Sequence, residues 1–141
     1  GKAGPVVVDG VEGVRDAGLA ARAALDPDPR PALYAGVALL MLGDVARAES
    51  MLRTAIQRGE RPELLVNYGR VRAAMGDDPG ARASFLRAAF ASDASVATLP
   101  RALRAELLQE VARRRQALRA GAADTLPPLP ESLAASADDA G

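Results

Sequence analysis

The sequence predicts an all-α protein, and three observations support this fold class. Apolar residues make up 49% of the 141 residues. Aromatic residues contribute only 3%, so the apolar residues are mostly aliphatic, chiefly alanine and leucine. Alanine and leucine both have high helix propensity. Proline and glycine separate the chain into segments of helical length. No segment shows the apolar–polar alternation of period two that is typical of a β-strand.

Proline and glycine also indicate where the helices begin and end. Pro31, Pro62 and Pro79 suit the first turn of a helix, where the missing N–H has no intrahelical partner to lose. Gly59 and Gly121 suit positions just after a helix ends. The sequence therefore predicts six helices, at residues 11–25, 31–42, 45–58, 61–75, 79–91 and 100–119. The polar residues 92–95 interrupt the pattern before the last helix.

The two ends of the chain differ from the helical part. Residues 1–10 form an N-terminal arm, which suits a short strand, a tag remnant or a loose segment. Residues 122–141 hold three prolines and four acidic residues but no basic residue. A segment this poor in large apolar side chains cannot offset the entropy of ordering, so we expect a disordered tail. The predicted helical domain thus spans 11–121.

A sparse pattern occurs twice within this domain, 33 residues apart. The pairs Gly43-Asp44 and Gly76-Asp77 each combine a helix-ending glycine with an aspartate that can accept hydrogen bonds from the first N–H groups of the next helix. Each pair therefore predicts a tight turn between two antiparallel helices. In the second copy Asp78 is an alternative cap, because Pro79 follows it.

Other residues repeat with the same offset and suit close helix packing. Small residues are needed where two helix axes approach to about 8–10 Å. The matched pairs are Pro29 and Pro62, Gly36 and Gly69, Ala48 and Ala81, Leu52 and Phe85, and Ala55 and Ala88. The repeating unit is thus a helix–turn–helix hairpin, present as residues 29–61 and 62–95. A plain helical bundle with a coincidental repeat is the alternative.

The unit resembles the tetratricopeptide repeat (TPR), whose period is about 34 residues. The segments "YAG" at 34–36 and "NYG" at 67–69 are similar to the signature of its first helix. The resemblance implies a right-handed superhelix of helical hairpins, with 100–119 as a C-terminal capping helix. Two positions depart from the pattern: Ala32 replaces a large residue, and Arg72 replaces an aromatic one. We expect the stem of Arg72 to lie over the core.

The composition argues against several functions. The formal net charge is zero, which does not suit a nucleic-acid binder. The chain has no cysteine and no histidine, so thiolate chemistry and the commonest metal ligand are missing. No apolar run approaches the roughly 20 residues of a membrane helix, so no membrane insertion is expected. "GKAG" at 1–4 lacks the spacing of a phosphate loop, and Glu106 and Glu110 suit a solvated helix face. We expect no catalysis, cofactor or metal.

The resemblance to TPR proteins implies a concave groove lined by the first helix of each hairpin, which usually holds a peptide or helix of a partner protein. By matching position, the groove residues are Arg30, Leu33, Val37, Leu40, Met41, Glu63, Val66, Asn67, Arg70 and Ala74. Asn67 suits a hydrogen bond to a peptide backbone, and Arg70 suits a carboxylate. The apolar members suit an apolar side chain. The alternative for each is that another part of the chain covers it.

The last helix is rich in arginine, with six arginines against two glutamates in 100–119. The expected explanation of this run is that cations near a helix C-terminus are favourable, together with contact with the acidic tail. Docking of an acidic partner is the alternative.

These observations predict a non-catalytic scaffold for protein–protein interaction. Usage of 17 arginines against one lysine suggests a GC-rich bacterial genome. The resemblance to TPR proteins implies a place in a bacterial assembly such as a secretion, pilus or envelope machine, in the cytoplasm or in the periplasm and cell envelope. Two alternatives stay open. The chain can be an accessory domain of a larger enzyme that positions a protein substrate, or a self-association module that forms a homo-oligomer. Two units are fewer than the three that repeat folds usually need for stability.

Overall fold

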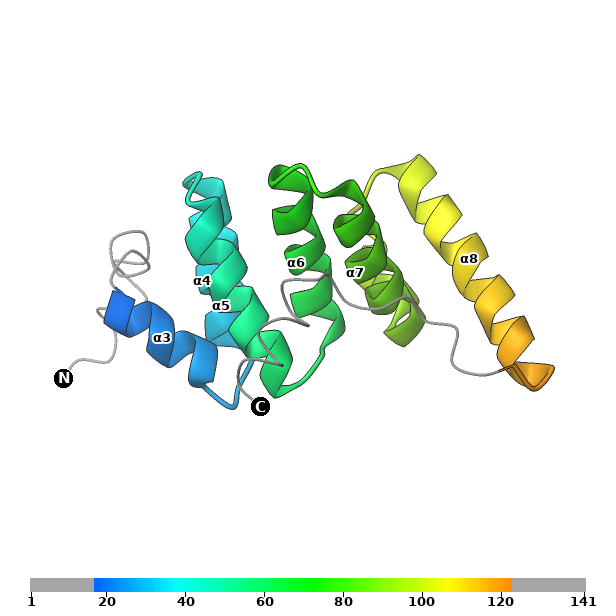
Figure 1. The fold of residues 1–141 in the computed structure, drawn as a ribbon, viewed down its shortest axis with the longest axis horizontal. Coiled ribbons are helices and arrows are strands. Elements are labelled where there is room, and N and C mark those ends of the chain that lie inside the picture. Colours follow the sequence, from blue (N-terminus) through cyan, green and yellow to red (C-terminus); the bar gives the residue numbers. More distant parts are fainter. Residues whose placement is uncertain (1–16, 123–141) are drawn as a thin grey trace. The chain divides into compact units, whose positions relative to one another are not determined.

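A computed structural model describes residues 17–122 (Figure 1). This part of the chain is all-helical and contains no strand. The chain divides into two compact units, Gly1–Glu60 and Arg61–Gly141, and the division falls at the boundary between the two predicted repeats. The elements are α3 (Ala17–Leu25), α4 (Arg30–Met41), α5 (Val45–Arg58), α6 (Pro62–Ala74), α7 (Asp78–Ala91), the 3-10 helix η1 (Asp93–Val96) and α8 (Arg101–Arg119).

The helix ends agree with the sequence prediction to within one residue wherever both ends are described. The first predicted helix, 11–25, can be checked only from Ala17 onward. The 3-10 helix was not expected; it lies in the segment that interrupts the helical pattern. The predicted N-terminal arm, 1–10, and the predicted disordered tail, apart from Ala122, lie outside the described residues.

Three helices end in the same way, at Gly43, Gly76 and Gly121. All three glycines have positive φ angles, of 82°, 84° and 95°, which glycine adopts without steric cost. After α4, the N–H of Gly43 donates to Leu40 O and the following N–H donates to Leu39 O. The corresponding two bonds follow α6 and α8. These bonds form the Schellman motif, which satisfies carbonyl groups at the helix end and reverses the chain.

An aspartate caps the second helix of each hairpin. Asp44 accepts from the backbone N–H of Arg47, at 3.4 Å, and Asp77 accepts from the N–H of Gly80, at 3.0 Å. The cap of α7 is thus Asp77, and its alternative Asp78 is the first residue of the helix. Both predicted Gly-Asp turns are therefore confirmed, with the second cap now assigned.

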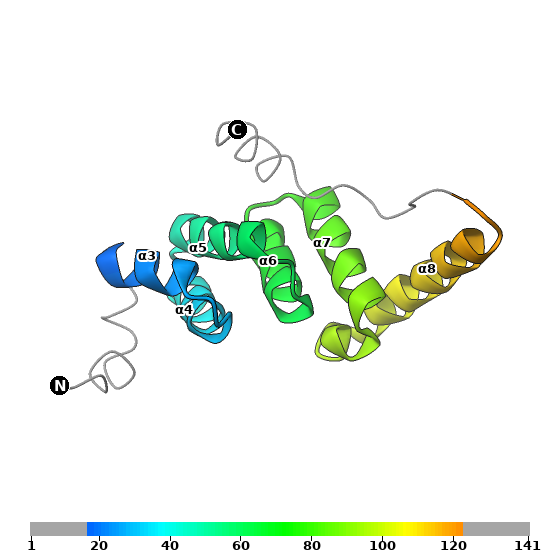
Figure 2. The same ribbon diagram turned by 90° about the horizontal axis from the view of Figure 1, so that it is seen from below.

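In the first unit, α4 and α5 form a hairpin, and α3 packs against both (Figure 2). A Cβ atom on Gly36 would lie 2.7 Å from Cγ and Cδ2 of Leu52, so the glycine lets the leucine side chain rest on the backbone of α4. Leu52, Ala48 and Ala32 are at most 1% exposed. The small Ala32 is thus fully buried in place of the large residue that the repeat pattern would have there.

In the second unit, α6 and α7 form the corresponding hairpin. A Cβ atom on Gly69 would lie 2.5 Å from Cε1 of Phe85, which repeats the contact between Gly36 and Leu52 one unit later. Ala81 and Ala88 are also buried, as expected from their spacing. The contact between a glycine and the large side chain of the following helix is therefore the same in both hairpins, and the repeated small residues are buried in each.

The last helix, α8, packs on α7 and runs in the same direction (Figure 1). An ion pair at 3.9 Å links Arg82 to Glu106 near the start of the two helices. Near their other ends, Arg115 Nη2 donates to the carbonyl of Phe90, at 2.9 Å. The buried side chains of α8 are Leu107 and Val111. The apolar surface that α8 buries is thus narrow.

Candidate functional site

The predicted groove residues lie on two helices, one in each unit. Five are on α4 and five on α6, and each set is described within its own unit. In each set, only the side chains that the unit leaves accessible can contact a partner.

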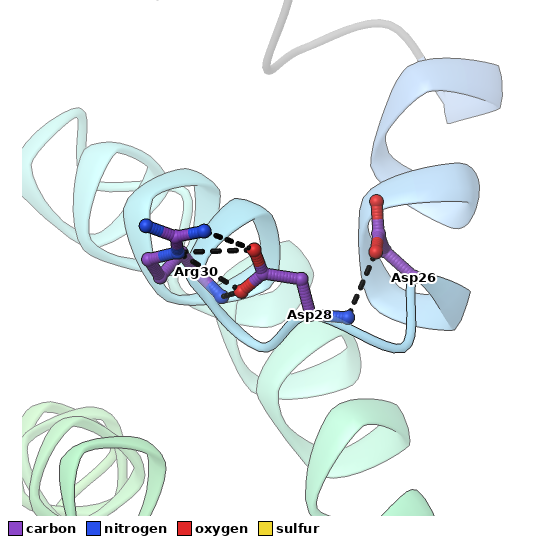
Figure 3. A network of polar contacts seen from close by, with 3 residues as sticks. All are labelled: Asp26, Asp28 and Arg30. Atoms are coloured by element: carbon purple, nitrogen blue, oxygen red, sulfur yellow. Dashed lines mark hydrogen bonds and ion pairs between the residues drawn. The ribbon is translucent and has the colours of Figure 1, made fainter.

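A short polar network sets the start of α4 (Figure 3). Asp26 Oδ1 accepts from the N–H of Asp28, at 2.8 Å, and Asp28 Oδ1 accepts from the N–H of Arg30, at 3.0 Å. Pro29 already has helical angles, with φ −73° and ψ −13°. Asp28 therefore acts as an N-cap one residue before the proline, and it fixes where the α4 face begins.

The side chain of Arg30 is held by the same aspartate. Its Nη2 lies 2.6 Å from Asp28 Oδ2, and its Nε donates to both carboxylate oxygens. The hydrogen bond to Asp28, with the charge attraction, raises the pKa of Arg30. The guanidinium remains largely exposed, at 72%. Arg30 thus presents a positive charge that its own chain already orients.

The remaining predicted residues of α4 form an apolar face. Met41 is 82% exposed, while Leu33, Val37 and Leu40 are partly exposed. The structure adds Tyr34, which is 66% exposed and which the sequence prediction omitted. The repeat offset of 33 residues would have identified Tyr34, because its equivalent in the second repeat, Asn67, was among the predicted residues.

On α6 the accessible set is smaller than predicted. Val66 is 3% exposed, so it belongs to the core and offers no surface to a partner. Glu63 and Ala74 are exposed, near the two ends of the helix. Asn67 and Arg70 are partly exposed and lie between them. The face of α6 is therefore polar where the face of α4 is apolar.

Asn67 and Arg70 bind each other and the chain beyond α7. Asn67 Nδ2 donates to the carbonyl of Glu63, at 2.8 Å, and Asn67 Oδ1 accepts from Arg70 Nη1, at 3.1 Å. Arg70 Nη2 donates to Thr98 Oγ1, at 2.6 Å. Both ends of the Asn67 amide are thus engaged, which leaves one N–H and one oxygen lone pair for a peptide backbone. The guanidinium of Arg70 is held in place by two neutral oxygen atoms.

A second arginine on α6 has a structural role instead. Arg72 Nε and Nη2 donate to Asp77 Oδ2, at 2.8 and 2.6 Å, and its side chain is 12% exposed. The prediction that its stem lies over the core is consistent with this burial. The hydrogen bond from Arg72, followed by the one from the N–H of Gly80, lowers the pKa of Asp77. The position equivalent to Arg72 in the first repeat is Leu39, so only the second turn has this ion pair.

Two other features to consider are a cluster of metal ligands and a membrane-spanning helix. No group of three or more acidic residues in that range is arranged to hold a metal ion. None of the helices between Ala17 and Arg119 combines the length and the apolar character that crossing a membrane requires. The accessible faces of α4 and of α6 are therefore candidate surfaces, each within its own unit.

Comparison of the whole chain with models of protein families, with curated proteins and with solved structures finds no match. The resemblance to TPR proteins consequently rests on the repeated residues alone.

Proposed function

We propose that the chain is a non-catalytic module for protein–protein interaction, built from TPR-like hairpins that stack into a right-handed superhelix and ending in α8 as its cap. The module binds a peptide or helix of a partner protein through the first helix of each hairpin. The observation that carries the proposal is the exposure of Tyr34 and Met41, at 66% and 82%, on α4.

The spacing of these residues places them on one side of the helix. Residues three, four and seven positions apart share a helix face. Arg30, Tyr34, Val37 and Met41 follow this spacing, and Leu33 and Leu40 lie beside them. A soluble protein rarely exposes several large apolar side chains together unless they bind something. A tyrosine and a methionine are well suited to such contacts, because one is rigid and amphipathic and the other adapts its shape.

The test compares two variants of the full chain. Tyr34→Ala with Met41→Ala removes the two most exposed apolar side chains of α4, whereas Gln57→Ala changes an exposed residue of α5 and serves as the control. Proteins that the wild type and the control capture from a lysate, but that the double variant does not, are identified by mass spectrometry.

Binding of each purified candidate is then measured by calorimetry. Loss of two apolar contacts predicts a decrease in affinity of about 2 kcal/mol, or roughly thirtyfold. Equal binding by the double variant and the control would show that the α4 face is not the binding surface.

Self-association through the same face is the second candidate, since exposed apolar side chains suit another copy equally well. Light scattering over a range of concentrations separates the two. A wild-type oligomer that the double variant converts to a monomer supports self-association, and a wild type that stays monomeric at high concentration excludes it.

A further inference from the structure

Some arginines of the second unit form no ion pair with an acidic residue among residues 17–122. We call Arg70, Thr98, Arg101 and Arg104 the arginine cluster. Arg70 Nη2 donates to Thr98 Oγ1, at 2.6 Å, and Arg104 Nη1 donates to the carbonyl of Ala97, at 2.8 Å. Ala97 and Thr98 are adjacent in the chain, so these two hydrogen bonds tie arginines of α6 and α8 to neighbouring residues.

Arg101 adds a third positive charge. It is exposed and precedes Arg104 by three residues, so the two arginines share a face of α8. Like charges at this spacing repel each other and destabilise the helix slightly. Within residues 17–122, none of Arg70, Arg101 and Arg104 has a carboxylate oxygen within ion-pair distance.

Within residues 17–122, the acidic side chains of α8 and of η1 pair with other arginines. The first turn of α8 contains no acidic residue. Glu106 pairs with Arg82, and Glu110 pairs with Arg113 and Arg114. Asp93 lies 3.7 Å from Arg115. Arg72 and Arg30 differ from the cluster, because each of them binds an aspartate.

We propose that the arginine cluster binds side-chain carboxylates of an acidic segment in the partner protein. Arginine suits this role because its planar group binds a carboxylate through two parallel hydrogen bonds. Thr98 and Asn67 hold Arg70 in place before the ligand arrives, which lowers the entropy cost of binding. The inference rests on the proposed function and extends it, because it names the chemistry that the second unit recognises.

The test uses the full chain and a fluorescein-labelled hexaglutamate peptide, with labelled hexaglutamine as the neutral comparison. Fluorescence anisotropy at low ionic strength measures the dissociation constants. Arg70→Gln and Arg104→Gln should each weaken binding of hexaglutamate about five- to tenfold, which is the effect of one partly exposed charge-assisted hydrogen bond. Addition of salt should weaken binding further, because it screens exposed charges.

Arg61→Gln is the matched control. Arg61 is exposed, belongs to the same unit, and loses the same single charge on substitution. It should change the dissociation constant less than twofold. Thr98→Val removes only the hydroxyl that orients Arg70 and should weaken binding about two- to threefold. Circular dichroism melting curves check that every variant remains folded.

Two results would overturn the inference. Equal weakening by Arg61→Gln and Arg70→Gln would show that hexaglutamate responds to net charge rather than to the cluster. Equal affinity of the wild type for hexaglutamate and hexaglutamine would show no recognition of carboxylates. Neither result bears on the proposed function, because partner capture through Tyr34 and Met41 is measured with different variants. Failure of that test, with hexaglutamate binding intact, would reject the α4 surface alone.

Discussion

The contact between Gly69 and Phe85 makes the sharpest prediction about stability. In Gly69→Ala, the added Cβ would lie 2.5, 2.6 and 3.0 Å from three atoms of the Phe85 ring. Ordinary carbon–carbon contacts are about 3.5–4.0 Å, so the ring must move by about 1 Å. Phe85 is 6% exposed, so its neighbours must move as well. Such overpacking costs about 1–3 kcal/mol.

The expected net effect includes an opposing contribution. Replacing glycine by alanine inside a helix stabilises it by about 1 kcal/mol. We therefore expect Gly69→Ala to lower the free energy of unfolding by about 1 kcal/mol, whereas the same change without a contact would raise it. Urea denaturation followed by circular dichroism measures this free energy.

A double-mutant cycle identifies the cause. Phe85→Leu alone should destabilise by about 1–2 kcal/mol, because it removes part of a buried ring. It also opens space for the new methyl group. The double variant should therefore be more stable than the sum of the single effects predicts, by at least about 1 kcal/mol. Additivity within about 0.5 kcal/mol would show that the two residues do not constrain each other, and would refute the packing argument.

Three further predictions concern a turn, an ion pair and a buried hydroxyl. Gly76→Ala should destabilise by about 1 kcal/mol, because the φ of Gly76 is 84° and an added Cβ would touch no other atom that could cause the loss. Gly59 has an extended backbone and equally open surroundings, so Gly59→Ala should be neutral or slightly stabilising. Equal melting temperatures of the two variants would contradict this. Asp77 has a lowered pKa, so its stabilising contribution is complete above the ordinary aspartate pKa of about 3.9 and is lost as the pH falls through the lower native value. The wild type should therefore lose more stability than Asp77→Asn between pH 6 and about pH 2 in acid titrations of the unfolding free energy, and equal losses by the two proteins would contradict this. Ser84 is fully buried, and within residues 17–122 its Oγ has no hydrogen-bond partner. Ser84→Ala should therefore raise the free energy of unfolding by about 1 kcal/mol. A loss of stability in the same urea assay would mean that the hydroxyl forms a hydrogen bond.

The accessible surface was predicted less well than the fold. The match to the TPR pattern included Met41, which is exposed, but it also included Val66, which is buried, and it missed Tyr34. The fate of a side chain on a helix face depends on which neighbouring elements cover it, and these are distant in the sequence. The arginine cluster was missed for the same reason, because Arg70 and Thr98 are 28 residues apart.

The sequence by itself determined the helices and the turns. Gly43 and Gly76 end helices because glycine tolerates positive φ, and Asp44 begins the next helix because its carboxylate accepts a hydrogen bond from a nearby N–H. These interactions span only a few residues, so a local pattern is enough to predict them.

Only the tertiary structure decided which of the repeated residues meet. The sequence showed that Gly36 and Leu52 are repeated as Gly69 and Phe85, and the structure showed that each glycine supports the large side chain of the helix that follows it. It also showed that Arg72 is neutralised by Asp77 whereas Arg70 is held by neutral oxygens. Contact, burial and charge balance depend on the distances between helices, which propensity and spacing do not contain.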